Sequence, residues 1–443
     1  MKTFPLLLCS LPLALGLTGC NRAVSEQAAI PAVAAAAAEQ TPATLPVISP
    51  VLPADATFHE PFDLDSLQHD FDVFSWQSFI ALNWPAAATG VADTSVSIGQ
   101  KPGVPTVWQT YKESRDIFLP GGATPPPWGV DVAPPTVCGE EDLPVLNQIA
   151  KVPNNVLDES AEPFQTGPLI DQNGQYTRFE ILTNEVMFNY IRGNQLYSAD
   201  GQQAFGAEAD FPSGTDSDVG AIMLKASWKV LGNHDDAAKF HTAQAYVYNN
   251  PDEHAGVKAA CKLQTVGLVG FHIGTKMKGN PQWIWSTFEH VDNAPTQGEP
   301  ISKQHYNYYQ PDCSDCAAVN TPPPRPWNPG NAYTQPSQVM RVAAITAPTK
   351  ALNARYHAAL EKLVPGSVWV NYELISTQWP TDAGSKTDPT GVPAPMFLAN
   401  TTLETYIQGE VRQTSSSCIQ CHNNATMTSG RFSDFTYLLQ RAQ

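Results

Sequence analysis

Five consecutive residues near the C-terminus, Cys418-Ile419-Gln420-Cys421-His422, constrain this chain more than any other feature. The pattern C-x-x-C-H is the attachment motif of c-type haem. Two thiols one turn apart can bond to the vinyl groups on one porphyrin edge, and the adjacent imidazole can then ligate the iron. A bare C-x-x-C is more often a redox disulfide or half of a zinc site. The trailing His therefore predicts one covalent haem c with His422 as the proximal iron ligand.

The position of the motif raises the question of a sixth iron ligand. Met427 is the one sulfur downstream of the motif, and it is too close to His422 to pass around the porphyrin edge. A sixth ligand must therefore come from upstream, or the iron has an open position. Met396, in a Pro-rich loop, is the best upstream sulfur, and Met340 is the second. An open position favours small-molecule chemistry, whereas Met/His ligation favours electron transfer.

The N-terminus has the pattern of an exported lipoprotein. Lys2 precedes an apolar run from Phe4 to Leu17, which reads as a secretory signal and is too short and Pro-interrupted to span a membrane. The following Thr18-Gly19-Cys20 resembles the end of a bacterial lipobox, so residues 1–19 are predicted to be removed and Cys20 to be lipidated. Asn21 resembles the pattern that is sorted to the outer membrane. We expect an exported protein that is anchored to this membrane and faces the periplasm.

The Ala- and Pro-rich residues 20–57 predict an extended tether. The rest of the chain is long enough to bury a large core. We divide this part of the chain into an α+β body (58–390) and a C-terminal haem c-binding segment that packs on the body (391–443). The net charge of −17 argues against nucleic-acid binding, since no basic cluster could neutralise phosphates. No second apolar run is long enough to span a membrane.

Four cysteines remain after the signal, the lipid and the haem are accounted for: Cys138, Cys261, Cys313 and Cys316. An even number in an oxidising compartment favours structural disulfides over a zinc site, with three pairings open. The pair at 313 and 316 lacks a following His, so it is not a second haem motif.

Hydrophobic periodicity predicts an α+β fold whose core is an antiparallel sheet with flanking helices. The 39 Pro and 29 Gly imply many loops. Strands are predicted where β-branched and aromatic residues lie between turn signals, at 221–231, 242–249, 262–273, 282–291 and 367–377. Helices are predicted at 71–84, where Pro85 ends the apolar run, and at 179–196 and 349–363. A capping-box pattern at 401–404 predicts a short helix towards the haem motif, so the C-terminal segment is expected to be helical.

Outside the haem motif, the densest polar and aromatic stretch runs from Phe271 to Asn293. A haem pocket needs apolar walls to exclude water and a few acid or base groups over the iron. We therefore take four residues of this stretch as candidate catalytic groups: His272, Lys276, Glu289 and His290. The two histidines could also supply the sixth ligand. The alternative for each residue is a hydrogen-bonded sheet position with no iron contact.

The C-terminal segment resembles bacterial single-haem proteins of the cytochrome c family. The likeness rests on Asn400–Tyr406, the haem motif, Ser433-Asp434-Phe435 and Trp283–Asn293, and it implies no particular activity. A second likeness, confined to the last 30 or so residues, is to lysine-cross-linked c-type cytochromes that oxidise hydroxylamine. These also carry C-x-x-C-H near the C-terminus, followed by an Asp-aromatic pair. That likeness implies a cross-linking lysine, for which Lys225, Lys229, Lys276 and Lys278 are candidates.

The sequence thus predicts a lipid-anchored haem c protein with a redox role. One hypothesis is an enzyme that oxidises or reduces a small molecule, such as a nitrogen oxide or peroxide, at an open iron site. A second is an electron-transfer cytochrome with an upstream Met or His as sixth ligand. A third is a binding or sensory lipoprotein whose haem is structural. The expected partners are the bacterial membrane, an unidentified redox protein and a small-molecule substrate.

Overall fold

The computed structural model describes residues 45–141, 143–147, 167–251, 256, 258–280, 282–302, 305–324, 335–382, 390–408 and 417–443. The predicted signal, the lipidation site Cys20 and residues 20–44 of the predicted tether lie outside the described residues.

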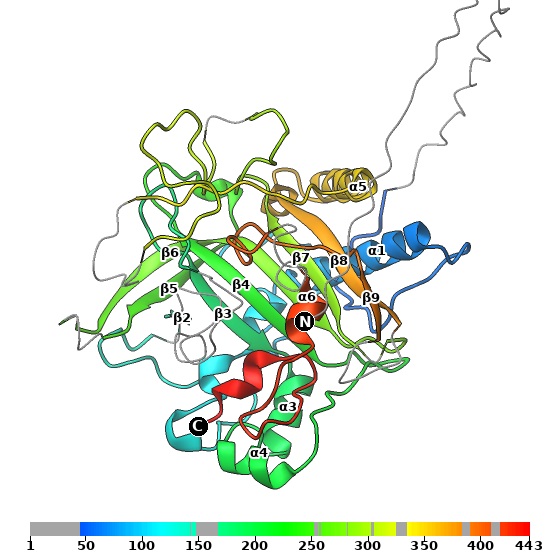
Figure 1. The fold of residues 1–443 in the computed structure, drawn as a ribbon, viewed down its shortest axis with the longest axis vertical. Helices are drawn as coiled ribbons and strands as arrows, with labels where there is room; N and C mark the ends of the chain where they lie inside the picture. Colours follow the sequence, from blue (N-terminus) through cyan, green and yellow to red (C-terminus); the bar gives the residue numbers. More distant parts are fainter. Residues whose placement is uncertain are drawn as a thin grey trace, which may run out of the picture. The chain divides into compact units, whose positions relative to one another are not determined.

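Nine strands form one sheet within the described part of the chain (Figure 1). The strands are β1 (Lys112–Glu113), β2 (Val145–Leu146), β3 (Arg178–Thr183), β4 (Ile222–Val230), β5 (Thr242–Asn249), β6 (Ala260–Thr275), β7 (Ile284–His290), β8 (Tyr372–Asp382) and β9 (Thr390–Ala394). Their order is β1-β3-β4-β6-β7-β8-β9, with β5 also paired to β6 and β2 paired to β5. All of these pairs are antiparallel except β2 with β5.

The helices that flank the sheet are α1 (Leu64–Leu82), α3 (Glu185–Gly193), α4 (Ala199–Phe205), α5 (Ala347–Leu363) and α6 (Cys418–His422). Short 3-10 helices are η1 (Val107–Thr110), η2 (Ser114–Asp116), η3 (Pro120–Gly122), η4 (Ala237–Lys239), η5 (Val368–Asn371) and η6 (Tyr437–Arg441). The predicted α+β class with an antiparallel sheet core and flanking helices is confirmed. No helix in the described ranges is both long enough and apolar enough to cross a bilayer.

Two of the sequence predictions for local structure are wrong, and a third holds only in part, because the predicted strand at 367–377 begins as the 3-10 helix η5 and only its second half lies in β8. The segment 179–196 is not one helix, because its first residues pair with β4 as strand β3. Asn184 then caps α3, its side chain accepting a hydrogen bond from the Met187 N–H at 3.1 Å. The predicted helix at 401–404 is a series of turns. There the Glu404 carboxylate accepts from the Asn400 N–H at 2.9 Å and so closes a turn rather than a helix.

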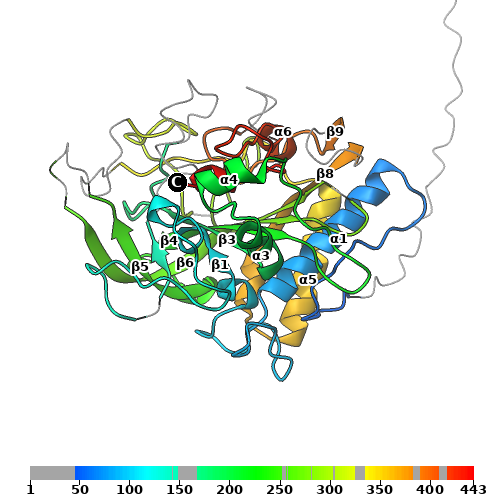
Figure 2. The same ribbon diagram turned by 90° about the horizontal axis from the view of Figure 1, so that it is seen from below.

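Helices α1 and α5 cover one face of the sheet, and α6 lies on the other (Figure 2). Aromatic side chains fill the interface on the α1 side. The ring of Phe79 stacks on Phe288 of β7 at 4.2 Å, and Trp76 stacks on Tyr356 of α5 at 4.8 Å. Such buried aromatic pairs add about 0.5–1.5 kcal/mol each beyond their buried area. These contacts join α1 and α5 to the sheet through one continuous aromatic core.

Strand β6 is long enough to pair with two different strands along the same edge, so the sheet divides into two arms there, and we call this point the fork. The first half of that edge pairs with β5, and the second half, from Gly270 onward, pairs with β7. The opposite edge pairs with β4 over Val266–Thr275. A bulge in the β4 pairing lies at the same point. The hydroxyl of Tyr372 bridges the fork, accepting from the His241 N–H and donating to the Leu268 carbonyl, both at 2.9 Å.

The structure contains two disulfides, Cys138–Cys261 and Cys313–Cys316. They select one of the three pairings that the sequence left open. The first spans 123 residues and fastens the loop at 138 to the start of β6. The second closes a tight loop at the surface, with a sequence separation of 3.

Candidate haem-binding site

Helix α6, which carries the C-x-x-C-H motif, docks on β8 through one side chain. The Gln378 carboxamide oxygen accepts from the Ile419 N–H at 2.9 Å and from the Ser417 hydroxyl at 3.2 Å. Its nitrogen donates to the Pro395 carbonyl at 2.7 Å. Because Ile419 and Ser417 are also buried, the first turn of the motif is fixed against the sheet.

Both motif cysteines remain as half-buried thiols at the two ends of one turn of α6. Cys418 packs against an apolar cluster formed by Ile345, Ile375 and Leu398. Two thiols at this spacing beside apolar walls suit the edge of a porphyrin, whose vinyl groups would be bonded to them.

The imidazole of His422 is half-buried, and its Nδ1 lies 2.7 Å from the carbonyl oxygen of Phe435. A carbonyl oxygen can only accept, so Nδ1 carries the proton and Nε2 carries the lone pair. Histidines that ligate metals almost always donate their second ring nitrogen in this way. The centre of the His422 ring also lies 4.5 Å from the ring centre of Trp285 and 5.4 Å from that of Tyr437. His422 is thus held in the tautomer and setting of an iron ligand.

Three buried polar atoms have no hydrogen-bond partner among the described residues: Trp285 Nε1, whose ring lies against His422, Thr287 Oγ1 and His272 Nε2. Trp285 and Thr287 alternate on one face of β7, and His272 of β6 is the cross-strand neighbour of Thr287. An unsatisfied buried polar group costs about 1–3 kcal/mol. A row of them on one face fits a site that receives a further polar group, so these residues and the motif together fit a haem.

Of the predicted acid/base residues, His272 lies on this face. Its Nε2 is 3.3 Å from a Glu404 carboxylate oxygen, an ion-pair distance, but it makes no hydrogen bond. Its other cross-strand neighbour, Lys225, is half-buried, with Nζ 5.7 Å from the centre of the Phe179 ring.

Lys276 is fully buried and faces the C-terminal segment. Its Nζ donates to the Asp434 carboxylate at 2.6 Å and to Asp210 at 3.1 Å. Burial raises the pKa of Asp434 to about 6, and the lysine opposes this shift. Lys276 therefore supports the turn before Phe435 rather than lying beside the thiols.

Glu289 and His290 lie on opposite faces of β7, as alternation along a strand requires. Glu289 is fully buried, pairs with Arg341 and accepts from the Thr401 N–H at 3.1 Å. His290 accepts from the Asp292 N–H at 3.1 Å through Nδ1 and donates to the Lys239 carbonyl at 3.0 Å through Nε2. Both ring nitrogens of His290 are thus bound to backbone, and the four candidates do not form one cluster.

The candidate sulfur ligands lie in different settings. Met396 is 39% exposed. The preceding carbonyl, that of Pro395, is bonded to the same Gln378 side chain as the Ile419 N–H, so the Met396 loop adjoins α6. Met427 is buried in the apolar cluster that also contains Trp285 and Phe435. The half-buried Met340 is tied to the C-terminal segment, since its carbonyl accepts from Gln408 at 3.1 Å.

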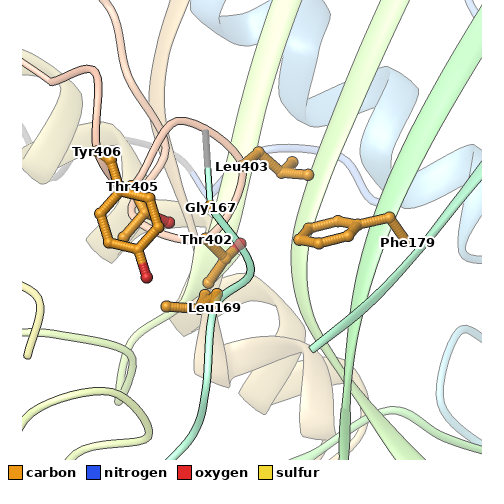
Figure 3. A pocket seen from close by; sticks show the side chains of 7 residues that line it. All are labelled: Gly167, Leu169, Phe179, Thr402, Leu403, Thr405 and Tyr406. Carbon is orange, nitrogen blue, oxygen red and sulfur yellow. The ribbon is translucent and has the colours of Figure 1, made fainter. Parts of the chain in front are cut away.

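Cavities are also found away from the motif in the described residues, and two of them can be compared with it. The first, of about 10 Å³, is lined by Gly167, Leu169, Phe179, Thr402, Leu403, Thr405 and Tyr406 (Figure 3). It has room for about one water molecule, not for a porphyrin. The second, of about 410 Å³, is lined in part by Asp116 and Glu180, and burial raises their pKa values to about 7 and about 8. No residue of the C-terminal segment lines it, so it is separate from the haem motif.

Sequence reasoning missed the groups that orient the motif. The Phe435 carbonyl and the Gln378 side chain act through backbone contacts that no residue pattern reports. The triplet Ser433-Asp434-Phe435 was noticed only through its family likeness. Comparison with known proteins adds no further guidance, because no family model, curated protein or solved structure matches this chain. The functional assignment therefore depends on the site itself.

Proposed function

We propose that this protein is a c-type cytochrome with a redox role. Cys418 and Cys421 would hold one haem through thioether bonds, and His422 would ligate its iron. The hydrogen bond from His422 Nδ1 to the Phe435 carbonyl is the observation that carries this proposal, because it prepares Nε2 for a metal. When bound, the haem would supply a one-electron centre that can also take a small-molecule ligand.

The residues around the motif have distinct tasks in this proposal. Trp285, Ile419 and Phe435 belong to one apolar cluster beside the motif and would exclude water from it. His272 lies with its Nε2 3.3 Å from a Glu404 carboxylate oxygen, so it could exchange a proton with a bound ligand. Thr287, its cross-strand neighbour, could donate through its hydroxyl.

We favour oxidation or reduction of a small molecule, such as a nitrogen oxide or peroxide, as the redox role. The buried polar atoms of Trp285, Thr287 and His272 that make no hydrogen bond within the described residues support this choice, since an electron carrier needs no such groups. Anchoring at Cys20 in the periplasm-facing leaflet and an unidentified redox partner protein remain part of the proposal.

Electron transfer is the second candidate, and a separate observation favours it. The Met396 loop adjoins α6 through Gln378. A sulfur in this loop could complete the iron coordination, which would close the site to substrates and give the Met/His pair typical of electron carriers.

Haem attachment is the primary test. The protein expressed with haem-maturation machinery should retain its haem after acid–acetone extraction, whereas Cys418→Ala and Cys421→Ala should retain less or none. The double variant Cys313→Ala/Cys316→Ala is the matched control, because it removes the other C-x-x-C pair, which forms a surface disulfide. Full extraction of haem from the native protein would refute the proposal.

The state of the iron separates the two candidates. For the enzyme, the ferrous protein should be mainly high-spin and bind carbon monoxide readily, and His272→Gln should change ligand affinity or turnover without loss of haem. For the electron carrier, the spectrum should be low-spin with a sulfur–iron absorption band. Loss of that band in Met396→Ala would exclude the open-site enzyme.

A further inference from the structure

We infer that the buried pair Lys276–Asp434 positions the axial histidine and thereby sets the reduction potential of the haem. This inference rests on the proposed function, since it concerns the iron ligand His422. Lys276 and Asp434 act through the Phe435 carbonyl, which accepts the hydrogen bond from His422. Lys276 and Asp434 are thus positioning residues and not catalytic ones.

The acceptor of the His422 proton lies in a turn that is closed by its own hydrogen bonds and also held from outside. Within the turn, the Ser433 hydroxyl donates to the Thr436 carbonyl at 2.6 Å. Asp434 and Phe435 both have left-handed backbone conformations, with φ of +50° and +62°. Residues other than glycine rarely adopt this conformation unless surrounding contacts impose it. The position of the Phe435 carbonyl, 2.7 Å from His422 Nδ1, therefore depends in part on the contacts of Asp434.

Three segments outside the C-terminal segment form hydrogen bonds with Asp434. The Asp434 carboxylate accepts from Lys276 Nζ at 2.6 Å and from the Phe211 N–H at 2.7 Å. Its backbone carbonyl accepts from the Trp283 indole at 2.8 Å. Lys276 follows β6 directly and Trp283 precedes β7, so the sheet itself defines where the turn lies.

The ion pair is the strongest of these contacts. Both side chains are fully buried. In such surroundings, charge-assisted hydrogen bonds are short and strong, and an unpaired charge cannot be left behind without rearrangement. Loss of Lys276 should therefore release the turn and weaken the bond between Phe435 and His422.

The effect on the iron has a predictable sign. A carbonyl that accepts from Nδ1–H makes the imidazole a better electron donor, which stabilises ferric iron more than ferrous iron. Releasing the carbonyl should raise the midpoint potential. Removing the positive charge of Lys276 alone acts in the opposite direction, because it leaves more negative charge near the iron.

The double variant Lys276→Met/Asp434→Asn isolates positioning from charge. It changes no net charge, and the asparagine oxygen can still accept from the Phe211 N–H. We expect it to retain covalent haem and to have a more positive midpoint potential. Losing a hydrogen-bond partner of a metal ligand typically has an effect of about 10- to 100-fold on metal affinity or activity. If the equilibrium constant between ferric and ferrous iron changes by the lower value of about tenfold, the midpoint potential of this one-electron couple shifts by about 59 mV.

The test is spectroelectrochemical titration of the native protein, the double variant, Lys276→Arg and Lys350→Met. Lys276→Arg keeps a buried cation for Asp434 but changes the shape of the donor, so its potential should shift in the positive direction by less than that of the double variant. Lys350→Met is the matched control, since Lys350 is 47% exposed and pairs with Glu299 at the surface. It should leave the potential unchanged.

The outcomes separate this inference from the proposed function. A native potential, or a more negative one, in a haem-loaded double variant would overturn the positioning role. Absence of covalent haem from the native protein would instead refute the cytochrome assignment. If the double variant does not fold, Lys276→Arg alone decides: a less ideal partner for Asp434 should give a smaller positive shift, and an unchanged potential would overturn the inference.

Discussion

Replacing Glu289 with glutamine should destabilise the fold by about 3–5 kcal/mol, the usual cost of breaking a buried ion pair. Glu289 is fully buried and pairs with Arg341, which is only 4% exposed. The amide oxygen can still accept from the Thr401 N–H, so the loss comes mainly from the guanidinium charge of Arg341, which keeps only the more distant Glu373 carboxylate at 4.0 Å. Since domains are stable by about 5–15 kcal/mol in total, the effect should be a large fraction of the whole.

Urea unfolding followed by tryptophan fluorescence measures this loss. With a slope of about 3 kcal/mol per molar urea, the midpoint should fall by about 1 M or more. Glu299→Gln is the matched control, because it breaks an exposed pair with Lys350 and should cost less than about 1 kcal/mol. The double variant Glu289→Gln/Arg341→Met should recover much of the stability, since it strands no charge.

The reasoning would be refuted by a Glu289→Gln protein whose midpoint lies within experimental error of the native one. Loss of turnover at unchanged stability would point instead to the acid/base role that the sequence suggested for Glu289. The measurement thus decides between an anchor for the C-terminal segment and a catalytic group.

Three further outcomes are expected. Cys20→Ser should release soluble protein from the membrane fraction, and its retention there would contradict the lipid anchor. Burial raises the Glu180 pKa from 4.5 to about 8, so this group's stabilising contribution is complete below pH 4.5 and is lost as the pH rises towards 8; stability measured across that range should decline less steeply in Glu180→Gln. Replacing Cys138 and Cys261 with alanine should lower the free energy of unfolding by about 2–4 kcal/mol, and an unchanged urea midpoint would show that this disulfide is not stabilising.

Much of the sheet could be predicted from local pattern. The predicted strand at 242–249 coincides with β5, and the strands at 221–231 and 282–291 match β4 and β7 to within a few residues. Their β-branched and aromatic residues between turn signals are a local property. The prediction of one helix at 179–196 was wrong because the apolar spacing there suits both a helix and a strand. Pairing with β4, a non-local contact, makes the first residues of this segment a strand.

Of the proposed site, local sequence pattern offers only the motif at 418–422, which contains the residue types that covalent haem attachment requires. The groups that orient it come from distant positions: Lys276 meets Asp434 across 158 residues, and Gln378 meets Ile419 across 41. The strand alternation that the sequence predicted already implied that Glu289 and His290 point in opposite directions. The two residues could therefore not both face the same site.

The fork at β6 determines how the sheet can open. Within the described residues, β5 and β7 each pair with β6 and not with each other. Amide hydrogen exchange in β5 therefore reports on one arm of the sheet, and exchange in β7 and β8 reports on the arm to which α6 is docked. Haem attachment should slow exchange in the second arm more than in the first. The hydroxyl of Tyr372 connects the two arms at their junction, so its removal should make their opening more independent.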